Sequence, residues 1–190
     1  MIHSFLYRLS QMYPLSAQGQ QALRARLVYE SLPKGSILLE AGAINTRLYY
    51  VVNGIAHAWY KREGKLITSW FSHEEHFIIS SNSFLLQQPS YEAIELLTDA
   101  ELISIEHSDL EMLYQQYPEV NSIVRLISQQ YLLIYEERVR SLRCLTAVER
   151  YERFAAQYPE LLQRIPLQYI ATFLGTTPQN LSRIRRPKKK

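Results

Sequence analysis

The stretch YIATFLGTTPQNLSRIRR, residues 169–186, contains two short apolar runs separated by a single glycine. Gly175 follows the first run, at the point where a left-handed residue commonly ends a helix. Thr177 suits the N-cap of a second helix, and Pro178 suits its first turn. The stretch therefore predicts a helix-turn-helix, with a first helix over residues 167–174 and a second helix that begins at Pro178.

The side chains of this predicted pair divide into two faces. The inward positions are apolar or small: Ile170, Ala171 and Leu174 in the first helix, Leu181 and Ile184 in the second. The polar positions of the second helix are expected to face outward as a DNA-binding set: Thr177, Gln179, Asn180, Ser182, Arg183, Arg185 and Arg186. Gln and Asn can pair with adenine and Arg with guanine in the major groove, while clustered Arg suits phosphates. The alternative is an ordinary helical pair with a polar surface.

The charge of the chain is unevenly distributed. The net charge of +3 includes seven basic and no acidic residues over positions 163–190, while the remainder has 14 basic and 18 acidic residues. A polyanion would be attracted to this end of the sequence. The terminal run RRPKKK could also be only a solvated basic tail, so its position directly after the predicted helix pair carries the argument.

Upstream, the hydrophobic period changes twice. Residues 1–30 are expected to be helical, with a break near Pro14. Short β-branched and aromatic runs then predict strands over residues 37–39, 48–52, 55–60, 66–71, 93–97 and 101–106. Asn53-Gly54 is a hairpin-turn signal, and a helical turn is expected near Phe84. Regular short strands of this kind are typical of a barrel or sandwich. Ser108 is expected to cap the next helix, which ends near Pro118.

The longest periodic segment covers residues 118–143 without glycine or internal proline. Its apolar positions recur at steps of three or four and form the predicted dimer interface: Val120, Ile123, Val124, Ile127, Tyr131 and Ile134. A helix of this length, ~40 Å, exceeds what a small barrel can cover, which favours pairing with a second copy. Burial within its own chain is the alternative. Thr146 and Glu149 then form a capping-box pattern for a further helix.

These segments, in this order, resemble the CRP/FNR transcription regulators. The resemblance is carried by LPKGSILLEAG, by LYYVVNGIAHAWY and by the helix-turn-helix. It implies an α+β fold with an N-terminal jelly-roll barrel like that of cyclic-nucleotide-binding domains (residues 1–117), a dimerisation helix (118–144) and an all-α DNA-binding domain (145–190). The family's recognition-helix positions correspond here to Gln179, Asn180 and Arg183. Double-stranded DNA and a second copy are the implied partners, with RNA polymerase and an unknown small-molecule effector as further candidates.

The sequence departs from the family's cyclic-nucleotide binders at the ligand site. These binders use Gly-Glu for the ribose and Arg-Ser or Arg-Thr for the phosphate. The corresponding region here reads HFIISSNSFLLQQPSYEAIELL, with no Gly-Glu after Phe77 and with Ser90-Tyr91 in place of the arginine pair. We expect no cyclic AMP binding by the usual mode, because the phosphate would lack a bidentate partner. The candidate effector pocket is marked by Ser80, Ser81, Ser90 and Tyr91. A filled barrel without a ligand or cofactor is the alternative.

A second departure concerns the end of the sequence. Family members usually follow the recognition helix with a small β-hairpin wing, whereas only Pro187 and three lysines follow here. We therefore expect a full wing to be missing. A sensing or protein-interaction module without DNA binding is the alternative function that this departure raises.

The remaining patterns indicate neither an enzyme nor a membrane protein. The motif HEEH, with His73 and His76, has too little information to predict a metal site. No phosphate loop, nucleophile elbow, signal peptide or membrane-length apolar run is present, and Cys144 is the only cysteine. We expect a cytoplasmic, non-enzymatic regulator.

Overall fold

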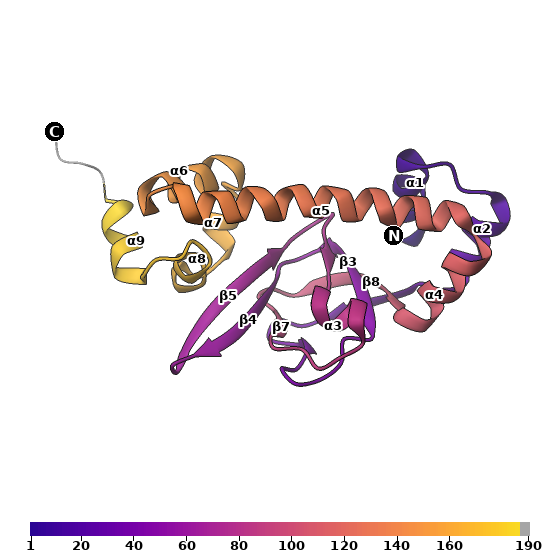
Figure 1. The fold of residues 1–190 in the computed structure, drawn as a ribbon, viewed down its shortest axis with the longest axis horizontal. Helices are drawn as coiled ribbons and strands as arrows, with labels where there is room; N and C mark the ends of the chain where they lie inside the picture. Colours follow the sequence, from indigo (N-terminus) through magenta and orange to yellow (C-terminus); the bar gives the residue numbers. More distant parts are fainter. Residues whose placement is uncertain (187–190) are drawn as a thin grey trace. The chain divides into compact units, whose positions relative to one another are not determined.

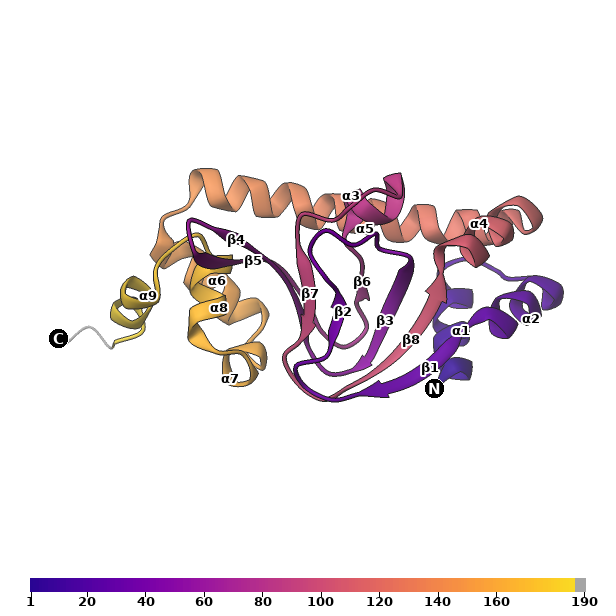
Figure 2. The ribbon, with the colours of Figure 1, turned by 90° about the horizontal axis from the view of Figure 1, so that it is seen from below.

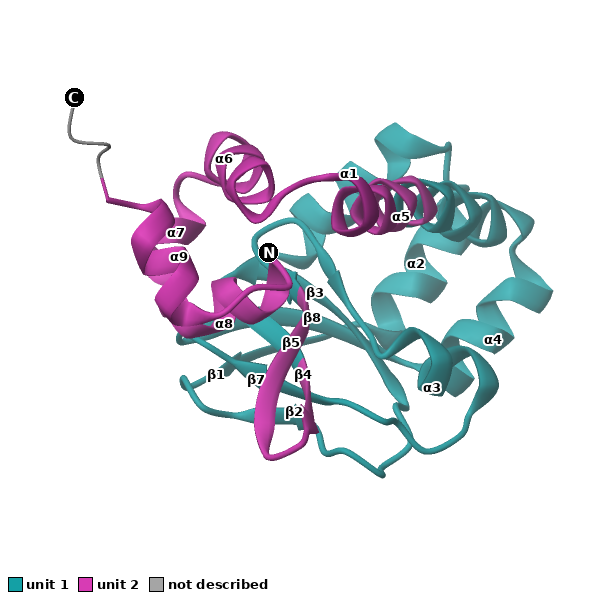
Figure 3. Cartoon of the chain, turned by 60° about the vertical axis from the view of Figure 1, so that its left-hand side comes forward, with its two compact units in different colours: residues 1–58, 71–131 teal, residues 59–70, 132–190 magenta. Residues whose placement is uncertain are grey.

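The computed structural model describes residues 1–186, so the lysines of the terminal basic run, Lys188–Lys190, lie outside the described part. The chain forms two compact units (Figure 3). Unit 1 comprises residues 1–58 and 71–131, and unit 2 comprises residues 59–70 and 132–190. The boundary passes through one helix and through one β-hairpin, so each unit is built from segments that are far apart in the sequence.

Two four-stranded sheets form the barrel, as Figure 2 shows. The first has the order β1 (Val28–Leu32), β8 (Ala100–Glu106), β3 (Arg47–Asn53), β6 (Phe77–Ile78). The second has the order β2 (Ile37–Leu39), β7 (Ala93–Leu96), β4 (Ala56–Arg62), β5 (Lys65–Ser72). Strand β1 pairs with β8, β2 with β7, and β3 with both β6 and β8, and all four pairings are antiparallel. This is a jelly-roll arrangement, and the expected α+β class with an N-terminal barrel is confirmed.

The first sheet is apolar on both faces. Val51 pairs with Leu102, and Tyr50 pairs with Ile103 in the next register position. Successive side chains of a strand point to opposite faces, and all four of these side chains are buried. Tyr50 and Ile103 belong to a cluster with the helices of unit 1, while Val51 and Leu102 face the other way. The barrel wall therefore separates two apolar layers.

The helices of unit 1 form the second layer. They are α1 (Ile2–Met12), α2 (Ala17–Arg26), α3 (Ser81–Leu86), α4 (His107–Gln116) and the first half of α5 (Pro118–Cys144) (Figure 1). Phe5 packs on the ring of Tyr50 at a centroid distance of 4.5 Å. Leu113 and Ile123 complete the same cluster. Pro118 occupies the first position of α5, as predicted.

Three local predictions were wrong. Residues 28–30, expected to be helical, belong to strand β1 (Val28–Leu32), because pairing with β8 overrides the local helical spacing. Asn53-Gly54 is not a hairpin turn: β3 and β4 belong to different sheets, and Gly54 (φ 114°) carries the chain between them. A Cβ at Gly54 would lie 2.6 Å from that of Ala100. Helix α4 begins at His107, one residue before the predicted cap Ser108.

Unit 2 combines C-terminal helices with the outer part of a hairpin. Its helices are the second half of α5, α6 (Ala147–Gln157), α7 (Leu161–Arg164), α8 (Leu167–Phe173) and α9 (Pro178–Ile184). Thr146 and Glu149 form the predicted capping box of α6. The hairpin part consists of the ends of β4 and β5 around Glu63-Gly64. Among the described residues, no helix has the length and apolar character that would let it cross a bilayer.

Candidate nucleic-acid interface

The α8–α9 pair forms as the sequence predicts. The expected inward side chains of the first helix, Ile170, Ala171 and Leu174, are all buried. From α9, Leu181 is fully buried, at 0% exposure, and Ile184 is half-buried. Gly175 has a φ of 64°, the left-handed conformation that turns the chain between the helices. Two aliphatic side chains therefore hold α9 from one side.

The start of α9 is fixed by a cap. The Thr177 hydroxyl accepts a hydrogen bond from the backbone N–H of Asn180 at 3.2 Å, and Pro178 is the first helical residue. These contacts satisfy part of the hydrogen-bonding capacity that a helix start leaves open. The orientation of α9 is therefore specified at its N-terminus as well as by its buried face.

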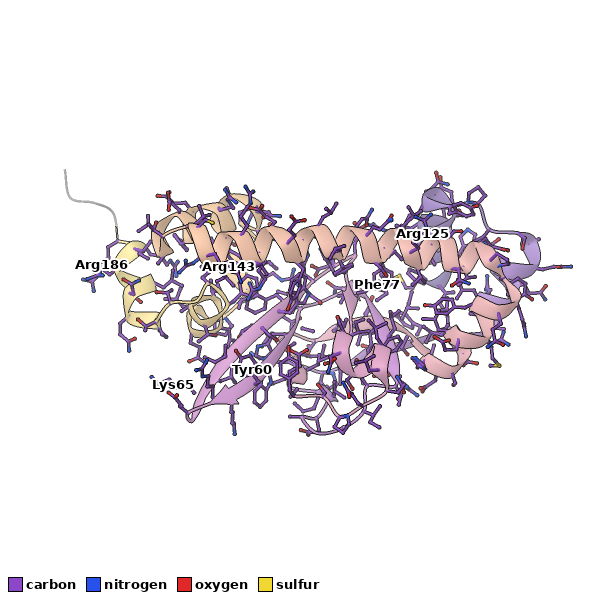
Figure 4. The ribbon with its side chains drawn as sticks, viewed as in Figure 1. Tyr60, Lys65, Phe77, Arg125, Arg143 and Arg186 are labelled. Carbon is purple, nitrogen blue, oxygen red and sulfur yellow. The ribbon has the colours of Figure 1, made fainter. Side chains whose placement is uncertain are left out.

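The opposite face of α9 is polar and open to solvent. Gln179, Ser182 and Arg183 are exposed and lie three and four residues apart along α9, so they share one face of the helix. Arg185, the C-cap of α9, and Arg186, which follows the helix, are exposed as well, and Figure 4 labels Arg186 just beyond α9. The exposed face of α9 therefore carries the amide of Gln179 and the guanidinium of Arg183, both hydrogen-bond donors.

Asn180 lies differently from its predicted neighbours, because its side chain is half-buried and bound within the pair. Its Nδ2 donates to the Thr176 hydroxyl at 2.8 Å, and its Oδ1 accepts from an Arg183 Nη at 2.8 Å. The chain of contacts from Thr176 through Asn180 orients the Arg183 guanidinium. The amide is therefore placed as a brace for Arg183.

Arg150 on α6 braces the turn between α8 and α9. Its Nε donates to the Leu174 carbonyl at 2.7 Å and one Nη donates to the Leu145 carbonyl at 2.5 Å. The other Nη lies 3.4 Å from the Gly175 carbonyl. One guanidinium thus joins the end of α8, the turn and the segment before α6. Sequence reasoning missed this residue, since its acceptors are backbone carbonyls, two of which lie more than 20 residues away along the chain.

Two further contacts hold α8 within unit 2. The Thr68 backbone N–H on β5 donates to the Thr172 hydroxyl at 3.1 Å. The Arg138 guanidinium lies over the Phe173 ring, 3.8 Å from its centroid, and burial lowers the pKa of Arg138 to about 10. A half-buried cation on an aromatic face is a favourable local contact. The hairpin and α5 therefore both fix the first helix of the pair.

Glu137 joins α5 to α6 in the same unit. Its carboxylate accepts hydrogen bonds from Arg140 on α5 and from Arg153 on α6. The hydrogen bond from Arg140 is the largest of the causes that hold the pKa of Glu137 below its ordinary value, and the charges of Arg140 and Arg153 act in the same direction. Ion pairs between side chains therefore stabilise the junction between α5 and α6.

The predicted dimer stripe of α5 is used mainly inside the chain. Val120 and Ile123 are each 2% exposed and belong to the core of unit 1, with Val124 and Ile127 packed against them. The Tyr131 hydroxyl accepts the Phe77 backbone N–H at 2.8 Å. Only Ile134 of the six predicted residues is exposed. The apolar face of the first half of α5 therefore packs against its own chain, in the core of unit 1.

The exposed apolar residues of α5 lie further along the helix. Leu132, Tyr135, Val139 and Leu142 have exposures of 66%, 58%, 39% and 40% and recur at steps of three and four. Leu133 is exposed to a similar extent, at 65%. These residues belong to unit 2, and their spacing is close to the 3.5-residue period of a coiled-coil seam. The predicted stripe, Val120 to Ile134, lies mostly N-terminal to this exposed surface.

In the barrel, the four candidate effector residues do not converge. The Ser90 hydroxyl donates to the Glu92 carbonyl at 2.7 Å and lies 2.9 Å from the Ser80 hydroxyl, and both serines are buried. Ser81 and Tyr91 are exposed. Ser80 and Ser90 thus belong to a closed polar network, in which the Ser80 N–H also donates to the Asn45 side chain.

The charge of this region is unfavourable for a phosphate. The sequence has no Lys or Arg between positions 66 and 124, and the carboxylate-bearing Glu92 is buried. His57 is buried as well, with Nε2 3.6 Å from Glu95, and burial lowers its pKa to about 4. His57 is therefore neutral near pH 7. Sequence reasoning did not single it out, because an isolated histidine in a strand carries no motif.

The HEEH segment brings His73 and His76 together, with ring centroids 4.0 Å apart. The His76 Nδ1 lies 3.0 Å from the Glu74 carbonyl. Within residues 1–186, no group of three or more His, Cys, Asp or Glu is arranged to hold a metal ion. We assign no metal centre to this segment.

Residues 29–117 match the family model of the cyclic nucleotide-binding domain. No curated protein matches the sequence at a significant level. The family match covers the barrel and α4, and it names the domain type of the N-terminal part of the chain.

Solved structures share the fold of nearly the whole chain. CLP from Xanthomonas campestris, a c-di-GMP responsive global regulator, has a TM-score of 0.69 and 18% identity over 89% of each chain. FixK2 from Bradyrhizobium japonicum has a TM-score of 0.72 and 18% identity, covering 83% of this chain and 82% of its own. A protein from Eubacterium rectale described as a CRP/FNR-family transcriptional regulator has a TM-score of 0.69 and 16% identity, covering 92% and 85%. The predicted CRP/FNR-like fold is confirmed.

Proposed function

We propose that the chain is a sequence-specific DNA-binding transcription regulator of the CRP/FNR type, and not an enzyme. The observation that carries the proposal is the polar face of α9. Gln179 and Arg183 point to solvent while Leu181 anchors the helix from behind. A short helix with a solvent-exposed amide and guanidinium face is suited to the major groove, where Gln pairs with adenine and Arg with guanine.

The charge of the two units supports a polyanionic partner. Unit 2 contains 15 Lys or Arg and 6 Asp or Glu, a net charge of +9, whereas unit 1 contains 6 and 12, a net charge of −6. The unit that carries α9 would attract DNA, and the barrel unit would not. The basic character extends well beyond the C-terminal tail.

The side chains of α9 divide between reading and supporting roles. Gln179, Ser182 and Arg183 are proposed to reach base edges, with Arg183 oriented by Asn180. Thr177, Arg185 and Arg186 are proposed to face phosphates. Contacts of the two kinds have different consequences, because base contacts set specificity and phosphate contacts set register and salt dependence.

A homodimer is proposed through the second half of α5. The exposed stripe Leu132, Tyr135, Val139 and Leu142 would be covered by the same stripe of a second copy, as in a two-stranded coiled coil. Two α9 helices would then read half-sites ~34 Å apart, one turn of DNA. RNA polymerase is a further partner that this type of regulator implies.

The barrel is proposed as an effector domain that does not hold a cyclic nucleotide by charge pairing. A phosphate in it would lack an arginine fork and would meet the buried carboxylate-bearing Glu92. An effector can shift DNA affinity only if it binds one arrangement of the units better than the other. The effector of this domain is expected to be uncharged or cationic, because Glu92 is buried and no Lys or Arg occurs between positions 66 and 124.

The test is DNA binding by the full chain, followed by fluorescence anisotropy. The duplexes are the promoter region of its own gene and a random sequence of equal length. The wild-type chain should prefer the promoter duplex, and Arg183→Ala should cost ~1–3 kcal/mol on that duplex with little change on random DNA. Arg125→Ala, an exposed arginine of α5 in unit 1, is the matched control. Equal losses on both duplexes would contradict the reading role.

A further inference from the structure

The turn of the β4–β5 hairpin carries a second basic surface on unit 2. It consists of Lys61, Arg62 and Lys65, which flank Glu63-Gly64 and are all exposed. Within the described residues, none of the three side chains makes an ion pair or hydrogen bond. We call this set the hairpin cations. With Glu63 as the one acid, the turn has a local net charge of +2.

The backbone of the turn places two of the cations side by side. Glu63 (φ 52°) and Gly64 (φ 73°) both have positive φ, as in a type I′ two-residue turn. Arg62 ends β4 and Lys65 begins β5, so the turn makes them cross-strand neighbours on one face of the hairpin. Like charges in this position repel each other. A bound anion would relieve that repulsion.

The hairpin is fastened to the helix pair that carries the candidate DNA surface. Thr68, three residues beyond Lys65, is buried and donates its N–H to Thr172 of α8. The Thr172 hydroxyl in turn donates to the Tyr169 carbonyl at 3.1 Å. The β5 strand, α8 and α9 are thus consecutive neighbours within unit 2, and the hairpin cations have a fixed place relative to α9.

The figures show where that place is. In Figures 1 and 2 the hairpin turn and α9 both lie toward the same end of unit 2, at the left of each view, with α8 between β5 and α9. Figure 4 shows Lys65 at the hairpin turn and Arg186 at the end of α9. A duplex lying on α9 continues past the helix on both sides, so its backbone can pass the hairpin turn.

We propose that the hairpin cations bind the DNA backbone beside the groove that α9 occupies, as a second, sequence-independent contact of the same unit. This rests on the proposed DNA-binding function. Arg62 and Lys65 contribute direct phosphate contacts from one face of the hairpin, and Lys61 contributes longer-range attraction from the other face. The contact adds affinity and salt dependence and carries no base preference.

The experiment measures the salt dependence of binding to a fluorescent random-sequence duplex of about 40 base pairs, long enough to pass beyond a pair of half-sites. Because binding to random DNA is dominated by phosphates, each lost contact reduces the slope of log K against log salt by about 0.9. The double variant Arg62→Gln/Lys65→Gln should therefore flatten the slope by about 1 to 2 per chain. Arg24→Gln/Lys34→Gln, two exposed cations of unit 1, is the matched control and should leave it unchanged.

Three results separate this inference from the proposed function. If the wild-type chain binds DNA and the hairpin variant keeps the wild-type slope, the hairpin contact is wrong and the α9 function stands. The same holds if the variant binds DNA normally but loses transcription activation with RNA polymerase, since the partner of the hairpin is then an acidic protein surface. If the wild-type chain binds no duplex at low salt, both proposals fail. Equal circular dichroism spectra confirm that the variants are folded.

Discussion

Removing the Arg150 guanidinium should destabilise unit 2 although the side chain lies outside the candidate DNA surface. The substitution Arg150→Met keeps most of the aliphatic stem and deletes the donors to the carbonyls of Leu174 and Leu145. Hydrogen bonds from a charged donor contribute about 1.5–3 kcal/mol each, and the sum is reduced here by partial solvent exposure. The third contact, at 3.4 Å to Gly175, adds little. We expect a loss of about 2–4 kcal/mol in the free energy of unfolding of unit 2.

Tryptophan fluorescence makes this loss measurable in the full chain. Both tryptophans, Trp59 and Trp70, belong to unit 2, so a urea titration followed by their emission reports the unfolding of this unit. Arg143→Met, an exposed arginine of α5, is the matched control and should lose less than about 0.5 kcal/mol. Arg150→Lys should lose less unfolding free energy than Arg150→Met, because an ammonium can donate to one of the two carbonyls but does not have the planar guanidinium fork. If Arg150→Met loses no more than the control, the bracing role is refuted.

Three further predictions concern the barrel and α5. Burial lowers the pKa of His57 to about 4, so the unfolded chain, with a pKa of about 6.5, takes up the proton at a higher pH than the folded chain. The free energy of unfolding should therefore drop by about 3 kcal/mol as the pH falls from about 6.5 to about 4. His57→Gln should abolish that part of the pH dependence in urea titrations followed by circular dichroism, and an unchanged profile would disprove it. Leu132→Glu should raise the dimer dissociation constant at least about tenfold in sedimentation velocity, whereas Met112→Glu, an exposed control on α4, should not. Equilibrium dialysis with cyclic AMP should give a Kd no tighter than about 1 mM, and a micromolar value would contradict the charge argument.

The sequence predicted best those features that depend on neighbouring residues. Thr177, Pro178 and Gly175 mark the α8–α9 turn by cap and φ preferences that act within a few residues. Thr146 and Glu149 do the same for α6. Local hydrogen bonds and backbone preferences suffice at these positions, so pattern reading finds them.

Features that depend on distant residues were missed or misplaced. The strand β1 exists because β8 offers a partner more than 60 residues later, which helical spacing cannot indicate. The apolar stripe of α5 predicts a buried face, but it does not say whether the covering surface is α4 and α1 or a second chain. Arg150 and Thr172 have roles that only the packing of unit 2 reveals.

The candidate site was only partly predictable for the same reason. The outward positions of Gln179 and Arg183 follow from helical periodicity relative to Leu181. The engagement of Asn180 with Thr176 and Arg183 depends on side-chain geometry. The hairpin cations join the same unit through a bond between β5 and α8 that no sequence motif marks.

Selection of bound duplexes from a random-sequence pool tests the central claim, that α9 presents its polar face to the DNA major groove. The wild-type chain should enrich a two-fold symmetric site whose half-sites are about 10 base pairs apart. With Arg183→Ala, the preference should relax at one position of each half-site, while the symmetry and spacing remain. Failure to enrich any sequence, or an unchanged site with the variant, would contradict the claim.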